Sequence, residues 1–402
     1  MTIDRLREVA ASHRDRIADF CSRLIQTPSL PGQEMQAAEL IMSEMKALRY
    51  DDVWQDEVGN VIGLIKGDRS GKSVMLNTHM DHVDIGDRSS WDYDPYSGEI
   101  RDGYVCGRGA VDIKGPTSSQ VYAPFLAREA GLPIYGDVYV VGVVQEEVGG
   151  LGSIELGKSL RVDCAIVGEP SSNTLRRGNR GRIEIIAIFR GRSCHASMPD
   201  KGINPHYSMA NFVAALRHVD RVEDPFLGSE TFTPTLVYTD QTSSNVVPSE
   251  LRLHIDWRTV PQRSPDEIKE MLASLLEKSL VDGAWGEIKV KDITLTTYTG
   301  ATRNVPAHFP PFLIDEEHPL VRIAQEALSE SFSRKVEVKR WDFATDAGHL
   351  VAAGIPSIGF GPGDETLAHT NQERISIEEM VEASMAYAFL CHRLTNPVAW
   401  AS

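Results

Sequence analysis

Four strand-like apolar runs of this chain each lead into an acidic residue or a histidine, and this pattern limits the folds open to the chain. The runs start at Val74, Val138, Cys164 and Ile355. The polar residues that follow them are, in the same order, His79, the pair Glu146 and Glu147, Glu169, and His369. In open α/β sheets, ligands bind outside the carboxyl ends of the strands. We therefore predict an α/β fold that brings these side chains to one edge of a sheet.

A fifth candidate ligand, Asp112, lies in the glycine-rich stretch 107–115. Three carboxylates and two imidazoles that converge form a metal site, or two sites if one carboxylate bridges. Alone, each motif has an ordinary alternative, because such residues are also typical of polar turns and solvated surfaces. Asp81 is placed to accept the second ring N–H of His79 and so fix its tautomer. Of Glu146 and Glu147, one can bind metal while the other acts as a base.

The length of 402 residues favours two domains. Strand and helix patterns alternate between 74 and 168, which is typical of a mainly parallel sheet. From about 180 the order becomes strand, helix, two strands, helix, strand, as in a split βαβ (ferredoxin-like) α+β sandwich. The α/β pattern resumes near 315. We predict a first domain of residues 1–180 and 299–402, interrupted by an inserted domain of residues 181–298.

Local patterns predict several individual elements. Apolar residues recur at helical spacing in the first 25 residues, and the helical pattern continues over 14–50. The apolar side of this N-terminal helix comprises Leu6, Val9, Ala10, Ile17, Phe20, Leu24 and Ile25. The last strand of the inserted domain is expected near 288–297.

Composition narrows the functional classes. The formal charge of −16 argues against nucleic acid and anionic membranes as partners. No apolar run approaches the ~18 residues of a membrane span, and the N-terminus lacks the apolar core of a signal peptide. The five cysteines are scattered and never spaced Cys-x-x-Cys, which argues against disulfides and a thiolate zinc site. We expect a cytoplasmic protein.

The motifs together resemble one known family. They are His79-Met80-Asp81, the stretch 107–115, Glu146-Glu147, Gly168-Glu169-Pro170, and 359–363 with Ala368-His369-Thr370. The resemblance is to the co-catalytic metallohydrolases that include acetylornithine deacetylase, succinyl-diaminopimelate desuccinylase, aminoacylase and carboxypeptidase G. Segments 91–96 and 178–182 are most similar to the deacetylase/desuccinylase-like branch. One departure follows His369, where Gln372 replaces the usual Asn before Glu373.

The resemblance implies a zinc-exopeptidase type of catalytic domain with two zinc ions bridged by Asp112. His79 and Glu169 would complete one site, and Glu147 and His369 the other. Cobalt or manganese can substitute for zinc at such ligands. Glu146 would be the general base and acid, and Asp81 would orient His79.

The inserted domain would be a lid that also forms a homodimer. Its His195 matches a family histidine that reaches the partner subunit's active site and stabilises the oxyanion. Asn245 and Arg258 match lid positions that hold a substrate carboxylate or complete the site. The alternative for Arg258 is a surface ion pair. Arg180, at the domain junction, is expected to form ion pairs or to bind a substrate carboxylate.

The function expected is therefore hydrolysis of the amide bond of an N-acyl-amino acid. A dipeptidase or carboxypeptidase of the same family is the first alternative, because the motifs do not specify the substrate. A non-catalytic ligand-binding homologue is a more distant alternative, since such proteins usually lose a ligand or the base and this chain retains all of them.

Overall fold

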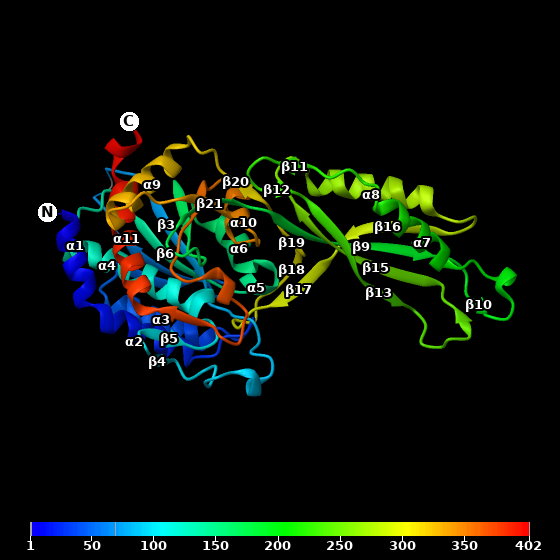
Figure 1. The fold of residues 1–402 in the computed structure, drawn as a ribbon, viewed down its shortest axis with the longest axis horizontal. Helices are drawn as coiled ribbons and strands as arrows, with labels where there is room; N and C mark the ends of the chain where they lie inside the picture. Colours follow the sequence, from blue (N-terminus) through cyan, green and yellow to red (C-terminus); the bar gives the residue numbers. More distant parts are fainter. Residues whose placement is uncertain (1, 69, 402) are drawn as a thin grey trace.

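The computed structural model describes residues 2–68 and 70–401, and the two largest sheets that they form differ in construction (Figure 1). The larger sheet has nine strands in the order β1-β2-β6-β3-β7-β22-β8-β20, with β21 beside β8. Its central strands β6, β3, β7 and β22 run parallel, while β1 and β2 are antiparallel to their neighbours. The bounds are β1 Asp52–Gln55, β2 Val61–Ile65, β3 Val74–His79, β6 Val138–Val143, β7 Cys164–Val167, β8 Leu175–Asn179, β20 Phe312–Leu313, β21 Val338–Trp341 and β22 Ser357–Gly359. The predicted mixed α/β sheet with a parallel centre is confirmed.

Helices cover both faces of this sheet, which explains why its strands are apolar along their whole length. On β3, Val74 and Leu76 face the core that contains the helices α2, α4 and α11, and Met75 faces the opposite core. One face carries α1 Thr2–Ser12, α2 Arg14–Ile25, α3 Met35–Ala47, α4 Gly115–Glu129, α9 Pro319–Phe332 and α11 Ile377–Thr395; the other carries α6 Leu151–Ser159 and α10 Ala347–Ala352. No helix among the described residues is both long and apolar enough to cross a bilayer.

For the N-terminal helical region, the predicted buried side is correct, but the predicted continuous helix is wrong. All seven residues of the predicted apolar side are buried. The helix is interrupted at His13, between α1 and α2, and again between Ile25 and Met35. Pro28 and Pro31 lie in the second break, where a proline removes a helical N–H and disfavours helix in the residue before it.

The second sheet is antiparallel and is covered by helices on one face. Its order is β13-β15-β9-β16, with the short β19 also paired to β9. The strands are β9 Gly181–Arg190, β13 Thr231–Thr239, β15 Glu250–Thr259, β16 Trp285–Val290 and β19 His308–Phe309, and the helices are α7 Pro205–Leu216 and α8 Pro265–Ser279. A separate core lies between this sheet and the two helices. In Figure 1 this unit extends to the right, away from both termini.

The single strand predicted near 288–297 is two strands. β16 pairs with β9, and β17 (Asp292–Thr296) pairs instead with β18 (Thr302–Pro306). The change of partner occurs at Lys291. Its backbone N–H donates to the carbonyl oxygen of Glu184, and its carbonyl oxygen accepts from the backbone N–H of Ala307. The predicted domain boundary at 298/299 therefore falls in the turn of the β17–β18 hairpin.

Candidate metal centre

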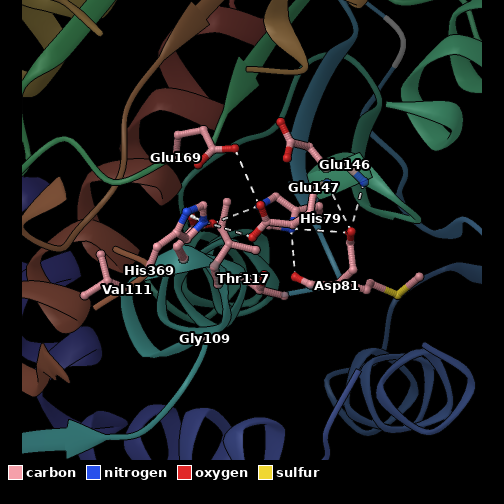
Figure 2. Close-up of polar contacts among 12 residues, drawn as sticks. His79, Asp81, Gly109, Val111, Thr117, Glu146, Glu147, Glu169 and His369 are labelled. Carbon is pink, nitrogen blue, oxygen red and sulfur yellow. Dashed lines mark hydrogen bonds and ion pairs between the residues drawn. The ribbon is translucent and has the colours of Figure 1, made fainter. Parts of the chain in front are cut away.

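The candidate ligands meet because three neighbouring parallel strands end at the same edge of the larger sheet. β3 lies between β6 and β7 and ends at His79. The short helix α5 (Glu146–Gly149) begins just after β6, and Glu169 lies two residues beyond β7. Figure 2 shows the side chains of His79, Glu169, Glu147 and His369 directed towards a common space.

A buried cluster consists of His79, Asp112 and Glu169. The Nε2 atom of His79 lies 3.0 Å from Oδ1 of Asp112 and 3.7 Å from Oε1 of Glu169. One donor atom from each residue lies within 4.8 Å of the others, as a shared cation requires. His79 and Glu169 are both buried.

A second cluster consists of Asp112, Glu147 and His369, and it is more open. Nε2 of His369 lies 3.0 Å from Oδ2 of Asp112 and 3.2 Å from Oε1 of Glu147. The His369 side chain is 51% exposed, whereas that of His79 is 2% exposed. Asp112 thus turns one carboxylate oxygen to each cluster, which is the geometry that a bridging ligand needs.

Asp81 contacts this centre in a way that differs from the prediction. The backbone carbonyl oxygen of Asp81, rather than its carboxylate, accepts the Nδ1–H of His79 at 2.9 Å; the carboxylate is 3.5 Å away. The carboxylate instead accepts the backbone N–H groups of Glu146 (3.0 Å) and Glu147 (3.1 Å). Asp81 therefore holds both the histidine and the start of α5.

The crowding of negative charge shifts the ionisation of these groups. Burial raises the pKa of Glu146 and that of Glu169 well above the usual range for a glutamate, and nearby carboxylates raise both further, against an opposing effect of His79. Hydrogen bonds to Asp112 and to Glu147 raise the pKa of His369 to about 10. Divalent cations that replaced these protons would relieve the same repulsion. The mixture of carboxylate and imidazole donors also suits zinc.

Beside the two clusters lies a cavity of about 260 Å³. Glu146 lines it together with candidate ligands from both clusters. The rest of the lining is Phe343, Ala344, Glu365 and Ala368. Oε2 of Glu365 lies 3.0 Å from Nη2 of Arg176, so this wall presents an ion pair next to an aromatic ring. A cavity of this size fits a small molecule.

The sequence of the chain matches the model of peptidase family M20/M25/M40 over residues 75–393. The chain belongs to this family. Among the M20/M25/M40 relatives is the "Uncharacterized protein YgeY" of Escherichia coli (strain K12), 29% identical over 98% of this chain and 96% of its own length. The succinyl-diaminopimelate desuccinylase of Sulfurimonas denitrificans is 28% identical over 88% of this chain and 92% of its own. The aminopeptidase PepT of Bacillus cereus shares the M20 fold, with a TM-score of 0.74, 18% identity and coverage of 95% and 99%.

The residues predicted for the lid of this M20 chain lie apart from the candidate metal centre. His195 (β10, Cys194–His195) pairs with β14 (Val246–Val247), and the N–H of Ala196 donates to the carbonyl oxygen of Asn245. The structure therefore brings His195 and Asn245 together, at the far end of the second sheet (Figure 1).

The two predicted arginines lie closer to the junction of the sheets. Nε of Arg258 donates to Asp256 at 2.7 Å, and Nη1 of Arg180 donates to the carbonyl oxygen of Ser229 at 3.0 Å. Within the described chain, none of these four residues, the three predicted for the lid and Arg180 at the junction, lines the cavity beside the candidate ligands.

Sequence reasoning did not single out Glu373, whose buried carboxylate contacts the loop that carries Asp112. Its position four residues after His369, inside the same family motif, was the available signal. Phe343 and Glu365, which line the cavity, were also not predicted, because their segments contain no metal-ligand pattern.

Proposed function

We propose that this protein is a metal-dependent amidohydrolase that cleaves the amide bond of an N-acyl-amino acid. The observation that carries the proposal is the position of Asp112 between two His/carboxylate clusters, with Glu146 beside them. The names of several relatives support deacylase activity. A desuccinylase, an acetylornithine deacetylase and a deformylase are 25–28% identical to this chain.

Two zinc ions would be held by the two clusters, with Asp112 shared between them. When bound, such ions acidify water and polarise a carbonyl group. The buried carboxyl of Glu146 is placed to take a proton from the attacking water and to deliver it to the leaving nitrogen. Asp81 fixes the start of α5 through the backbone of Glu146 and Glu147, so it keeps this base at the edge of the cavity.

We further propose that residues 181–298 form an inserted, ferredoxin-like lid on a catalytic domain of residues 1–180 and 299–402, with the short strand β19 beyond this boundary also joining the lid sheet. The lid would dimerise through its edge strand β13, which exposes Leu236, Val237 and Tyr238. Because His195 and Asn245 lie at the far tip, they would serve the active site of the partner subunit. Arg258 and Arg180, nearer the junction, would bind a substrate carboxylate.

A substrate panel tests the proposed activity. The metal-free protein is reloaded with Zn²⁺ or Co²⁺ and assayed on N-acetyl, N-succinyl and N-carbamoyl amino acids and on dipeptides. We expect amide hydrolysis that requires metal and is greatest on an N-acyl-amino acid. Preference for dipeptides would favour the dipeptidase alternative, and metal-loaded protein that hydrolyses nothing would favour a ligand-binding homologue.

The mechanism is tested with Glu146→Gln. This variant should lose about 10²- to 10⁴-fold in kcat, the range of general acid–base catalysis, and still bind two metal ions. Glu155→Gln is the control and should keep full activity, because the Glu155 carboxylate pairs with Lys158 and does not line the cavity. Near-normal turnover by Glu146→Gln would contradict the role given to this residue.

A further inference from the structure

Glu373 places a carboxylate inside the loop that carries the bridging aspartate. The side chain is fully buried. Its Oε1 atom accepts the backbone N–H groups of Val111 and Asp112, each at 3.0 Å. Its Oε2 atom accepts the N–H of Gly109 at 3.0 Å and the guanidinium of Arg108 at 2.6 Å. Four donors therefore converge on one carboxylate, and one of them belongs to the residue shared by both clusters.

The backbone around Glu373 is fastened to the same region. The Glu373 carbonyl oxygen accepts from the N–H of Gly107 (3.0 Å) and from the hydroxyl of Tyr93 (2.7 Å). Nδ2 of Asn371 donates to the carbonyl oxygen of Ser90 at 2.6 Å. These contacts fix the segment 369–373, and with it His369, against the loop that contains Asp112.

The two clusters depend on these contacts to different degrees. His79 and Glu169 lie at or just beyond the ends of β3 and β7, so the sheet itself holds them. In the other cluster, Asp112 lies in the short segment η2 (Ala110–Lys114), where its backbone is non-helical, and His369 lies in a turn, so both are outside the strands. Two of its three candidate ligands therefore depend on the contacts that Glu373 makes between residues 369–373 and the stretch that carries Asp112.

We infer that Glu373 is a positioning residue that holds Asp112 and His369 in register, and that the cluster of Asp112, Glu147 and His369 needs it more than the buried cluster does. This inference rests on the proposed two-metal centre. It adds a residue that binds neither metal nor substrate but determines how tightly the second metal is bound.

Glu373→Gln tests this role, because it keeps the size of the side chain while it removes the charge that pairs with Arg108 and one of the two acceptor oxygens. An amide offers one oxygen acceptor and one NH₂ donor. Whichever way the amide is turned, its NH₂ group faces two of the four donors. Either Val111 and Asp112 or Gly109 and Arg108 then lose their acceptor, and a buried donor without a partner is strongly disfavoured.

In the experiment, Co²⁺ is titrated into the metal-free chain, and binding is monitored by calorimetry and by visible absorption. The wild type should bind two ions. Glu373→Gln should bind the first ion within about threefold of wild-type affinity and the second about 10- to 100-fold more weakly, as expected when a partner of the metal ligands is removed. The absorption that develops with the second ion should change in position or intensity.

Glu230→Gln is a matched control, because Glu230 is an equally buried glutamate in the other unit. Its carboxylate accepts from the backbone N–H of Val222, from Nε1 of Trp257 and from Arg263. A general loss of stability should affect both variants, whereas only Glu373→Gln should weaken the second Co²⁺ site.

The outcomes separate the inference from the proposed function. If the wild type fails to bind two ions, both are wrong. If the wild type binds two ions and Glu373→Gln binds both with wild-type affinity, or weakens both sites equally, the inference alone is overturned. Should circular dichroism show that Glu373→Gln does not fold, Glu373→Asp decides. Its shorter side chain keeps the charge and both oxygens but draws them back from the four donors. Second-site affinity should therefore fall below that of the wild type while the first site stays within about threefold, and an unchanged second-site affinity would overturn the inference.

Discussion

The two sheets bury their apolar residues differently, and their polar residues differ accordingly. The nine-stranded sheet is covered on both faces, so polar side chains concentrate at its carboxyl edge, where the candidate metal ligands meet. The five-stranded sheet is covered on one face, and its other face carries ion pairs such as Glu184 with Lys291 and Asp256 with Arg182. In one sheet the charges gather at a single edge; in the other they spread over a face. Substitutions in the two sheets should therefore have different consequences.

The largest difference is expected between Asp112→Ala and Asp256→Ala. Asp112 lies between two imidazoles, and Asp256 lies between the guanidinium groups of Arg182 and Arg258, each at 2.7 Å. Asp112→Ala removes a ligand from both clusters, so activity should fall below detection and metal analysis should show fewer than two ions per chain. Asp256→Ala should retain both ions. Full metal loading of Asp112→Ala would contradict the bridging role.

A smaller loss is expected from His195→Ala in the second unit. If His195 stabilises the oxyanion in the partner's active site, kcat should fall about 10²- to 10³-fold while two metal ions remain bound. Mixing this variant with inactive Glu146→Gln should restore part of the activity, because mixed dimers contain one complete site. A strictly monomeric protein that is fully active in light-scattering and kinetic experiments would rule out a role in trans.

The separation of the two cores can be tested with Ile166→Val in β7 and Ile185→Val in β9. Both residues are fully buried, each in a different core. Each substitution should lower the free energy of unfolding by about 0.5–1.5 kcal/mol in urea titrations. The losses should add in the double variant within about 0.5 kcal/mol, because the residues share no partners. A larger deviation would show that the two cores are coupled.

A difference is also expected in how the stability of the two regions depends on pH. Burial, and then the charge of Asp81, raise the pKa of Glu34 to about 7. This group therefore binds its proton more tightly in the folded chain, and its contribution to stability falls as pH rises from about 4.5 to 7. In the second sheet, burial acts to raise the pKa of Glu184, but hydrogen bonds from His254 and Lys291 outweigh it and lower the pKa. The contribution of Glu184 is therefore lost as pH falls through the acidic range.

Unfolding measured across this pH range should show opposite changes in the two variants. Glu34→Gln should flatten the decline between pH 4.5 and 7, and Glu184→Gln should reduce the acid sensitivity of the second unit. Slopes that neither variant alters would show that other groups determine the pH dependence.

Sequence reasoning reached the residues of the two clusters because strand ends carry a local signal. His79, Glu147 and Glu169 follow apolar runs, and the parallel direction of β6, β3 and β7, though not their order in the sheet, follows from the alternation of strands and helices. The contacts of Asp81 and Glu373 were out of reach, because they depend on which backbone N–H groups a side chain meets after folding. The change of strand partner at Lys291 was missed for a similar reason: residues 285–296 have strand character throughout, and only the position of β18 separates them.

Asp81 has a consequence for any attempt to redesign the metal preference of this centre. Its carbonyl oxygen contacts His79 of the buried cluster, and its carboxylate contacts the backbone of Glu147, a ligand of the open cluster. A change of ligand type that shifted the backbone at residue 81 would be transmitted to both sites and to Glu146 at once. Altering one site independently of the other is therefore more promising at His369 itself, whose side chain is half exposed and takes part in none of these Asp81 hydrogen bonds.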